Sequence, residues 1–492
     1  MTAVLVALVV LPLLAAVLSL LPGRWAAPAA SVAAGVACLA LALALVPAAA
    51  RGSVAAGFLR VDAISVVFAL GTAFLYATTA VYSVGYLRGE HQRGDFSRYS
   101  RLFWVGLNLF AWAMLCAPLM NSLALLWIAV GITTVVSALL VALDGTRQGA
   151  EAAWKYVLLG SAGLGIALLA TIVMYSAGAA VLGSSYNLGI AGLLRAGATL
   201  PHTAVALAFV LAVVGFGTKV GLFPVHTWLP DAHSEAPTPV SAMLSGSLLA
   251  VSFYAVLRYY QIAGATLGSG FPRGVLLVFG MLSLLLAALY LIEQRNLKRL
   301  LAYSSVEHMG ILAIGVSFGA PLAFAGVLLH VLAHAAAKGN AFFGAGVLVH
   351  AYHTKDLGRI RGAFDRLPWT APLFLLAILA LSALPPFGLF RSEFLIVAGG
   401  LGSAHFAPAA AMVTLVTLAF LGLSMATTRM LFVPLAPQDG PGAASAPRGE
   451  PSVWMVVPMV VGVVALLVLG LHPPDALTAL IARGAAELGG AL

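Results

Sequence analysis

One lysine of this sequence lies inside an apolar run. Lys219 stands in LAVVGFGTKVGLFP, five residues before Pro224. If the run crosses a membrane, a charged lysine there costs about 2.5–3.5 kcal/mol on insertion scales. Loss of hydration also weakens its hold on a proton, so Lys219 is suited to accept and release protons. The alternative is a lysine near a helix end whose ammonium group reaches the membrane surface.

Two histidines and a second lysine share one predicted helix face. His330, His334 and Lys338 occur four residues apart in LLHVLAHAAAKGN. Each step of four turns a helix by about 40°, so the three side chains form a stripe about 12 Å long. Since histidine both donates and accepts protons near neutral pH, the stripe predicts a water-bridged proton relay. A metal site is an alternative, although no third ligand is expected nearby, and so is a purely packing role.

A glutamate follows a pair of prolines in a later apolar run. Glu393 lies in LPPFGLFRSEFLI, after Pro385 and Pro386. A buried carboxylate beside a helix break is the acidic counterpart of Lys219, and we expect it to take part in the same proton path. The alternative is a local ion pair with Arg391 that only holds the helix in place.

Further polar residues extend this set. Glu307 and His308, in LAYSSVEHMGIL, predict another polar step, with hydrogen bonding between helices as the alternative. His226 and its neighbours after Pro224 are expected to lie towards the cytoplasmic mouth of the path, where they would suit proton entry. A solvated loop explains its neighbours equally well, namely Asp231, His233 and Glu235.

The elements that position these residues are membrane helices. Of the 492 residues, 62% are hydrophobic and 8% are charged, whereas a soluble domain carries about 25% charged residues. Apolar runs of about 20 residues, the length that a helix needs to cross a bilayer, recur along the chain without the alternation of a β-barrel. Cys38 and Cys116 lie in separate runs and predict buried thiols rather than a disulfide. The net charge of +9 reflects loop residues and does not indicate nucleic acid as a partner.

We therefore predict an all-α integral membrane protein. Its first helix is expected to be retained, because no basic residue precedes it as in a signal peptide. A Gly/Ala/Pro-rich connection is expected at 438–451, and a weak amphipathic tail at 475–492. About fourteen transmembrane helices are expected, at residues 2–22, 28–49, 60–87, 102–118, 120–143, 153–177, 203–232, 237–260, 273–292, 298–318, 321–350, 370–400, 406–433 and 452–471.

Basic residues predict the orientation of these helices. Loops after odd-numbered helices hold fifteen Lys and Arg residues, and loops after even-numbered helices hold five. The positive-inside rule places the richer loops in the cytoplasm, so both termini are expected outside. The five are Arg51, Arg60, Arg195, Arg258 and Arg273; the fifteen are Arg24, Arg88, Arg93, Arg98, Arg101, Arg147, Arg295, Lys298, Arg299, Lys355, Arg359, Arg361, Arg366, Arg429 and Arg448.

Helices seven and twelve are interrupted by prolines, at Pro224 and at Pro385–Pro386. A membrane helix tolerates such a break where it is buried in protein or lines a polar cavity. Corresponding breaks in two halves indicate repeated transporter units. We predict inverted five-helix repeats at 102–260 (helices four to eight) and 273–433 (helices nine to thirteen). They are preceded by helices one to three at 1–101 and followed by a linker, helix fourteen and the tail at 434–492.

These stretches resemble a known group of membrane proteins. GFGTKVGLFPVHTWLPDAHSEAPTPVSAMLSG at 215–246, EAAWKYVLLGSAG at 151–163, LKRLLAYSSVEHMGI at 297–311, LLHVLAHAAAK at 328–338 and LPPFGLFRSEFLI at 384–396 carry the resemblance. The group comprises the antiporter-like subunits of respiratory complex I, multisubunit Na⁺/H⁺ antiporters and group 4 membrane-bound NiFe-hydrogenases. Within it, DAHSEAP and the segment 258–283 look most like the hydrogenase-4 component F type.

The resemblance implies a proton path along the membrane centre. Lys219 matches the lysine of the seventh helix, Lys338 the central lysine of the eleventh and Glu393 the terminal site of the twelfth, while His334 matches a polar family position one turn from Lys338. The chain departs from the family at Gly131, where a glutamate that pairs with the seventh-helix lysine is usual. A chain without this carboxylate is expected to hold Lys219 neutral for more of the time.

The leading functional hypothesis is a proton-translocating subunit of a hydrogenase-4, formate hydrogenlyase-like or complex I-like assembly in a prokaryotic inner membrane. The chain carries no redox ligands of its own. The resemblance therefore implies partner subunits that are antiporter-like, hydrogenase-like or iron–sulfur proteins, and that hold the nickel–iron and iron–sulfur centres. The rivals are a subunit of a cation/proton antiporter or bicarbonate-uptake complex, and a structural spacer that has lost pumping because of Gly131.

Overall fold

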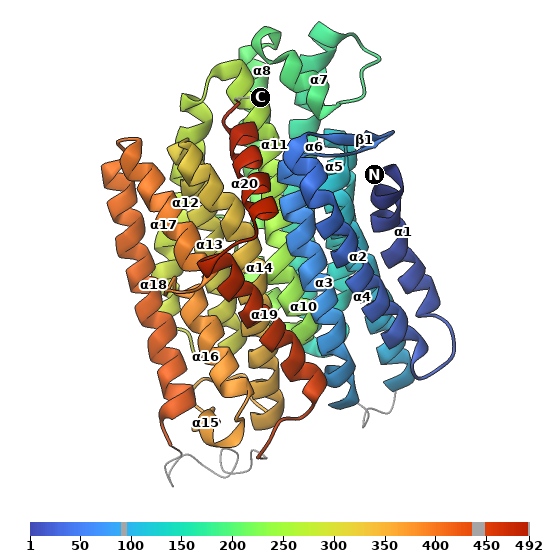
Figure 1. Ribbon diagram of the computed structural model, residues 1–492, viewed down its shortest axis with the longest axis vertical. Coiled ribbons are helices and arrows are strands. Elements are labelled where there is room, and N and C mark those ends of the chain that lie inside the picture. Colours follow the sequence, from blue (N-terminus) through green and yellow to red (C-terminus); the bar gives the residue numbers. More distant parts are fainter. Residues whose placement is uncertain (90–95, 435–447, 491–492) are drawn as a thin grey trace.

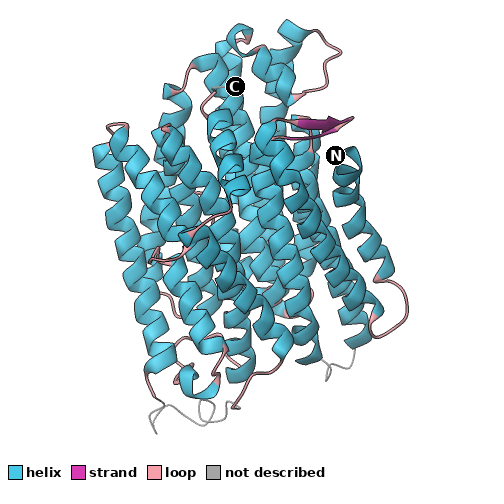
Figure 2. Ribbon diagram, viewed as in Figure 1, coloured by secondary structure: helices cyan, strands magenta, loops and turns pink. Residues whose placement is uncertain are grey.

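The computed structural model describes residues 1–89, 96–434 and 448–490. Long helices run along one common direction, and the one small sheet in this part of the chain lies near one end of the bundle (Figures 1 and 2). That sheet is an antiparallel hairpin of β1 (Val54–Ala56) and β2 (Leu59–Val61). The predicted connection at 438–451 falls largely outside the described residues, as does Arg93.

The described residues of the first half of the chain form eleven α-helices, two short 3₁₀ helices (Ala117–Leu119 and Gly197–Thr199) and one π-helical segment. The α-helices that precede the first break are α1 (Thr2–Leu18), α2 (Ala26–Arg51), α3 (Ala63–Gly89), α4 (Phe96–Cys116), α5 (Leu123–Val141), α6 (Arg147–Leu182), the short α7 (Ile190–Arg195) and α8 (His202–Val220). After the break come α9 (Trp228–Glu235), α10 (Thr238–Met243), a π-helical segment (Leu244–Leu248) and α11 (Leu249–Leu267).

The second half supplies the remaining helices. They are α12 (Gly270–Ile292), α13 (Leu297–Phe318), α14 (Pro321–Tyr352), α15 (Ala363–Arg366), α16 (Thr370–Leu381), α17 (Gly388–Gly402), α18 (Phe406–Phe432), α19 (Val453–Leu471) and α20 (Asp475–Leu488).

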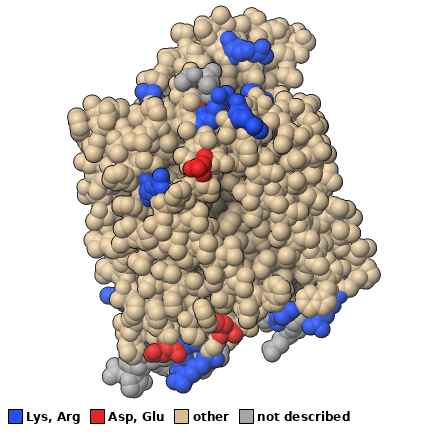
Figure 3. Space-filling model, in the orientation of Figure 1, with Lys and Arg blue, Asp and Glu red and all other residues tan. Residues whose placement is uncertain are grey.

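The prediction of an all-α membrane protein is confirmed. Within the described residues, twelve helical segments are long and apolar enough to cross a membrane, and α1 and α16 are shorter apolar helices. On the face drawn in Figure 3, a band below the middle carries no charged side chains, and the charged side chains lie above and below it. Each of the fourteen predicted spans contains a helix, while the number of crossings and the inverted repeats remain predictions.

The two proline-containing spans are interrupted. The first is divided into α8 and α9 around Pro224, and the second into α16 and α17 around Pro385 and Pro386. Helices α3, α13, α14 and the α10–α11 segment are almost wholly buried, whereas α2, α6, α12, α18 and α19 keep an outward apolar face. The breaks therefore adjoin a core of central helices, and this core holds most of the predicted proton-path residues.

The C-terminal segment is more than the predicted amphipathic tail. Helix α20 packs on α2, α3 and α14, and Glu487 accepts backbone hydrogen bonds from Ala63 and Ile64 at the start of α3, with N–O distances of 3.4 and 3.2 Å. The oxygens of the Glu487 side chain satisfy two of the free N–H groups at this helix N-terminus. Helix α20 thus caps the N-terminal end of α3.

A buried ion pair lies beside this contact. Arg258 donates to both carboxylate oxygens of Asp62 at 2.6 and 2.7 Å, and its guanidinium lies 4.7 Å from the centre of the Tyr254 ring. The placement of Arg258 in a loop was therefore wrong, because its charge is neutralised inside the bundle. Although burial opposes ionisation, Arg258 holds the pKa of Asp62 below its ordinary value.

Docking of α20 is expected to depend on pH. Burial, followed by the charge of Asp62, raises the pKa of Glu487 from 4.5 to about 7. The docked carboxyl keeps its proton up to about pH 7, whereas the undocked one loses it near pH 4.5. Docking is therefore strongest below pH 4.5 and weakens as the pH rises through 7, by on the order of tenfold or more.

Amide hydrogen exchange of α20, corrected for intrinsic rates, measures this effect. Glu487→Gln should remove the pH dependence and keep an acceptor for the start of α3. Glu450→Gln is a matched control, because Glu450 caps α16 through the backbone nitrogens of Trp369 and Thr370. An unchanged pH profile in Glu487→Gln would refute the assignment.

Candidate functional site

Three histidines from two helices form a cluster at the centre of the molecule. His308 lies on α13, and His330 and His334 lie on α14; all three are fully buried. The distance from His308 Nδ1 to His330 Nε2 is 3.1 Å, and His330 Nδ1 lies 2.9 Å from Ser392 Oγ on α17. The rings of His308 and His334 are 5.1 Å apart. His330 is therefore joined by hydrogen bonds to His308 on one side and to Ser392 on the other.

Glu393 joins the cluster from α17. Its Oε1 lies 3.9 Å from His308 Nδ1, and the residue is 6% exposed. The alternative of a local pair with Arg391 is wrong, because the Arg391 guanidinium points instead to the carbonyl of Gly470, at 3.4 Å. The Glu393 side chain thus lies beside the histidines and does not form an ion pair within its own helix.

A close approach of two helices makes this contact possible. A Cβ atom at Gly326 of α14 would lie 2.7 Å from the backbone oxygen of Ser392 and 2.9 Å from the backbone nitrogen of Ile396. Since backbone atoms cannot move aside cheaply, only glycine lets α14 and α17 pack at this distance. The glycine therefore sets the separation of His330 from Ser392 and Glu393.

Glu393 also borders a cavity on the outer side of the bundle. The cavity has a volume of about 380 Å³ and lies between the α16–α17 break, α17 and α18. Its wall is mostly apolar and includes the exposed ring of Phe394. The cluster therefore has a route to the surface through one carboxylate.

Lys338 lies one turn beyond His334 on α14. It is fully buried, and its ammonium group donates to the backbone oxygen of Leu301 on α13 at 3.0 Å. Glu307, also on α13, is buried as well. In the described part of the chain, Glu307 Oε2, His308 Nε2 and both His334 ring nitrogens have no hydrogen-bond partner. A buried polar atom without a hydrogen-bond partner destabilises the folded protein unless water or a mobile proton binds to it.

Lys219 sits at the end of α8, next to the break, rather than in mid-helix. Its ammonium group donates to the hydroxyl of Tyr156 on α6 and lies 4.6 Å from the centre of that ring and 5.9 Å from that of Trp228 on α9. Tyr156 in turn shares a hydrogen bond of 2.8 Å with Ser137 on α5. Aromatic rings stabilise a buried cation, so Tyr156 and Trp228 surround Lys219 with partners that carry no charge.

The position of the usual family glutamate lies on the same helix as Ser137. Gly131 is half-buried, and no described atom outside its own helix lies within 4 Å of the point where a Cβ would be. The backbone there has room for a larger side chain. In this protein a tyrosine hydroxyl takes up the contact to Lys219.

The segment after the first break forms the helix α9. The alternative of a solvated loop for Asp231, His233 and Glu235 is therefore wrong. His233 lies on α9 and is fully buried, with Nδ1 2.8 Å from the oxygen of Leu229. Its ring lies 6.2 Å from that of Trp228 and 5.9 Å from that of Phe342 on α14. His233 therefore lies between the environments of the two lysines, while His226 lies in the break itself and packs near Phe223.

The acidic neighbours of His233 form surface ion pairs instead. Asp231 binds Lys155 at 3.3 Å and also Arg299, and Glu235 binds Lys355 at 3.0 Å. These contacts fasten α9 to α6, α13 and the loop after α14. They fix the position of the break, and His233 of α9 faces the interior of the bundle.

Among the described residues, the histidine cluster offers suitable ligands for a metal ion. The prediction that no third ligand lies near the histidines was wrong, because atoms of His308, His330 and Glu393 all lie within 4.8 Å of one another. Two imidazoles and a carboxylate are a donor set that zinc accepts. The same atoms are joined by a direct His308–His330 hydrogen bond, so the geometry serves a proton relay equally well.

Several members of the site escaped sequence analysis. Tyr156, Trp228, Ser137 and Ser392 come from four different helices, and each contributes through a contact between helices. The signal was present for Tyr156 and Trp228, since both occur in the stretches that carry the family resemblance. Nothing in the spacing indicated that they would face Lys219.

Comparisons with known proteins identify the family of the chain. The family described as NADH:quinone oxidoreductase/Mrp antiporter, TM matches residues 120–421. A hydrogenase-4 component F homolog of Methylacidiphilum infernorum (isolate V4) is 36% identical over 363 residues, which are 73% of this chain and 76% of the relative. NADH-quinone oxidoreductase subunit N of Desulforudis audaxviator (strain MP104C) is 32% identical over 408 residues, 81% of this chain and 79% of the relative.

A solved structure shares the fold over nearly the whole chain. A chain of the Mrp complex from Dietzia sp. DQ12-45-1b superposes with a TM-score of 0.84 at 22% identity, covering 99% of this chain and 97% of that one. The fold and the buried ionisable residues define an antiporter-like membrane subunit. The chain belongs to the NADH:quinone oxidoreductase/Mrp antiporter transmembrane family, and the predicted likeness to the hydrogenase-4 component F type is confirmed.

Proposed function

We propose that this protein moves protons across a prokaryotic inner membrane as a subunit of a redox-driven complex of the hydrogenase-4 or complex I kind. The observation that carries the proposal is the sequence of buried ionisable groups from Lys219 through His233 and Lys338 to the histidines and Glu393. Ionisable groups inside a membrane protein are expensive and mark ion pathways. The named relatives that carry the family likeness are a hydrogenase-4 component homolog and an NADH-quinone oxidoreductase subunit.

Each group has one role in the proposed path. A proton taken up near His226 and the first break reaches Lys219, whose ammonium is held by Tyr156 and Trp228. His233 passes it towards Lys338, and His334, His308 and His330 carry it to Glu393. From Glu393 the proton leaves by way of the cavity between α17 and α18. Water completes the steps at which the side chains do not touch.

The two broken helices belong to the predicted repeats in this scheme. Residues 102–260 and 273–433 would be the inverted halves, each with one break beside an ionisable group. The basic end of the molecule would face the cytoplasm and both termini would lie outside. Electron transfer would take place in partner subunits that carry nickel–iron and iron–sulfur centres, and coupling to this chain would be electrostatic or conformational.

Purification from the native membrane tests the assembly. The tagged chain, extracted in a mild detergent, should bring with it a NiFe-hydrogenase-like or related redox subunit and iron–sulfur proteins, identified by mass spectrometry. Recovery with small antiporter subunits alone, or with one soluble carbonic-anhydrase-like protein, would overturn the redox proposal. The function would then be cation/proton antiport or bicarbonate uptake, which the same path could serve.

Gly131→Glu tests whether the missing carboxylate limits transport, as in a structural spacer that has lost pumping. The new side chain has room at this position and restores a carboxylate to α5, the helix that carries Ser137, the partner of Tyr156. A carboxylate that reaches Lys219 would favour the charged ammonium. We expect a rise in the redox-driven proton flux of about fivefold, at the lower end of couplings between interacting sites. Gly131→Gln is the matched control, because it adds the same volume without charge. Equal fluxes in the two variants would show that the tyrosine already replaces the carboxylate.

A further inference from the structure

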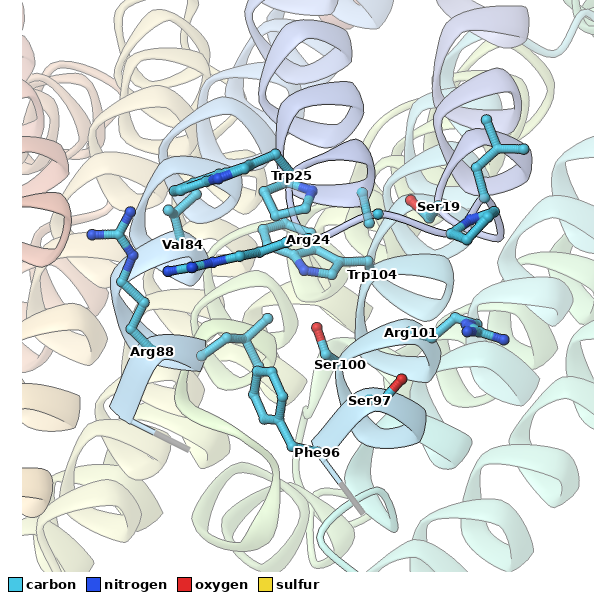
Figure 4. A pocket seen from close by; sticks show the side chains of 16 residues that line it. Ser19, Arg24, Trp25, Val84, Arg88, Phe96, Ser97, Ser100, Arg101 and Trp104 are labelled. Atoms are coloured by element: carbon cyan, nitrogen blue, oxygen red, sulfur yellow. The ribbon is translucent and has the colours of Figure 1, made fainter. Parts of the chain in front are cut away.

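A pocket outside the proton path lies at the end of the bundle where α1 joins α2. Its volume is about 290 Å³, and the α1–α2 loop, the last turn of α3 and the first turns of α4 enclose it. Figure 4 shows Arg24, Trp25 and Trp104 across the pocket from Phe96, Ser97 and Ser100. In the predicted orientation this end of the molecule faces the cytoplasm, at the level of the lipid headgroups.

The pocket concentrates positive charge from three elements. Arg24 comes from the loop, Arg88 from the end of α3 and Arg101 from the start of α4, and no acidic side chain of the described residues lines the pocket. The guanidinium groups of Arg24 and Arg88 lie 5.7 and 5.1 Å from the centre of the Trp25 ring. Such a cluster binds phosphate groups, because guanidinium donates two hydrogen bonds to adjacent oxygens.

A buried donor adds a second observation. Trp104 lines the pocket and is 1% exposed, and its Nε1–H has no acceptor within the described part of the chain. A buried N–H without an acceptor destabilises a protein by the cost of its lost hydration. An anionic oxygen seated among the arginines is the acceptor that this group lacks.

The surroundings distinguish a lipid from a small anion. Leu21 lines the pocket, and Val17 of α1 and Leu20 just after this helix present apolar side chains outward. Half of the Trp25 surface is exposed beside them, as is typical of aromatic residues at a membrane surface. An acyl chain that leaves the pocket would lie along α1.

We propose that this pocket binds the phosphate-bearing headgroup of an anionic phospholipid, with the arginines on the phosphate and the acyl chains along α1. The proposal is independent of proton transport, because it rests on residues that the path does not use. Basic pockets at the cytoplasmic side of membrane helices suit such headgroups.

Lipid titration of the delipidated full chain in neutral detergent tests the proposal. Dioleoyl phosphatidylglycerol should raise the apparent unfolding temperature, while dioleoyl phosphatidylcholine and inorganic phosphate should have little effect. The triple variant Arg24→Gln, Arg88→Gln, Arg101→Gln should lose at least about tenfold in apparent affinity, since each arginine near an anionic surface contributes about fivefold. The variant Arg359→Gln, Arg429→Gln, Arg448→Gln removes the same charge at the same predicted face and should keep the full effect.

A fourth variant separates ligand binding from folding. Trp104→Phe removes the buried donor and keeps an aromatic ring, so the phosphatidylglycerol effect, measured against the same variant without lipid, should weaken severalfold. Equal losses in the two triple variants would overturn the proposal, as would full stabilisation by inorganic phosphate alone. An undiminished lipid effect in the pocket variants would also overturn it.

Discussion

Replacement of Lys338 by methionine will abolish redox-driven proton transport and leave the protein folded. Lys338 is fully buried, and its ammonium group has the backbone oxygen of Leu301 as its hydrogen-bond partner. Methionine fills a similar volume but cannot carry a proton. Since a positioned proton-transfer group contributes about 10²–10⁴ in rate, we expect the flux to fall by about 100-fold or more.

Dye quenching in inverted membrane vesicles, energised by the redox substrate of the complex, measures this flux. Lys155→Met provides a matched control, because Lys155 lies at the surface of α6 and pairs with Glu151 and Asp231. Removal of a buried, incompletely paired charge is not expected to destabilise the chain, so the apparent unfolding temperature should not drop. A Lys338→Met variant that pumps at more than half of the wild-type rate would exclude Lys338 from the path.

Replacement of Lys219 by methionine should have an effect of similar size, although the family carboxylate is missing. The ammonium group is held by the Tyr156 hydroxyl and two aromatic rings, which keep a cation in place without neutralising it. A lysine so held can still cycle between charged and neutral forms. We therefore expect the proton flux of Lys219→Met to fall by about 100-fold.

Tyr156→Phe separates the hydroxyl from the ring. This variant keeps the cation–π contact and loses the hydrogen bonds to Lys219 and Ser137. The flux should fall by about tenfold, between the wild type and Lys219→Met. The structural-spacer hypothesis predicts the opposite, namely near wild-type flux in both variants. Vesicle assays of the two variants side by side decide between these outcomes.

The sequence predicted the groups of the site better than their partners. Lys219, Lys338 and Glu393 stood out because an ionisable residue in an apolar run is physically costly, and the spacing of His330 and His334 was enough to place them on one face. The His308–Glu393 contact was not predictable, because helical periodicity shows which face a residue occupies but not which helix it meets. The third possible metal ligand was missed for this reason.

For the fold, too, the sequence predicted the elements better than the contacts between them. Apolar length and proline positions predicted the helices and their interruptions, because the bilayer requires about 20 apolar residues for each crossing. The role of α20 was missed, since a short amphipathic segment has the same pattern whether it lies free or packs on α3. Arg258 was misassigned for a related reason, because its partner Asp62 is distant in sequence and neutralises its charge inside the bundle.

The number of protons moved per electron pair tests the central claim most directly. The purified native complex, reconstituted in liposomes, would be compared with the same complex carrying Lys338→Met, with electron transfer and pH change recorded together. Our account predicts that the variant still transfers electrons when an uncoupler is present but moves fewer protons per electron pair. An identical ratio in the two complexes would show that protons do not pass through this chain.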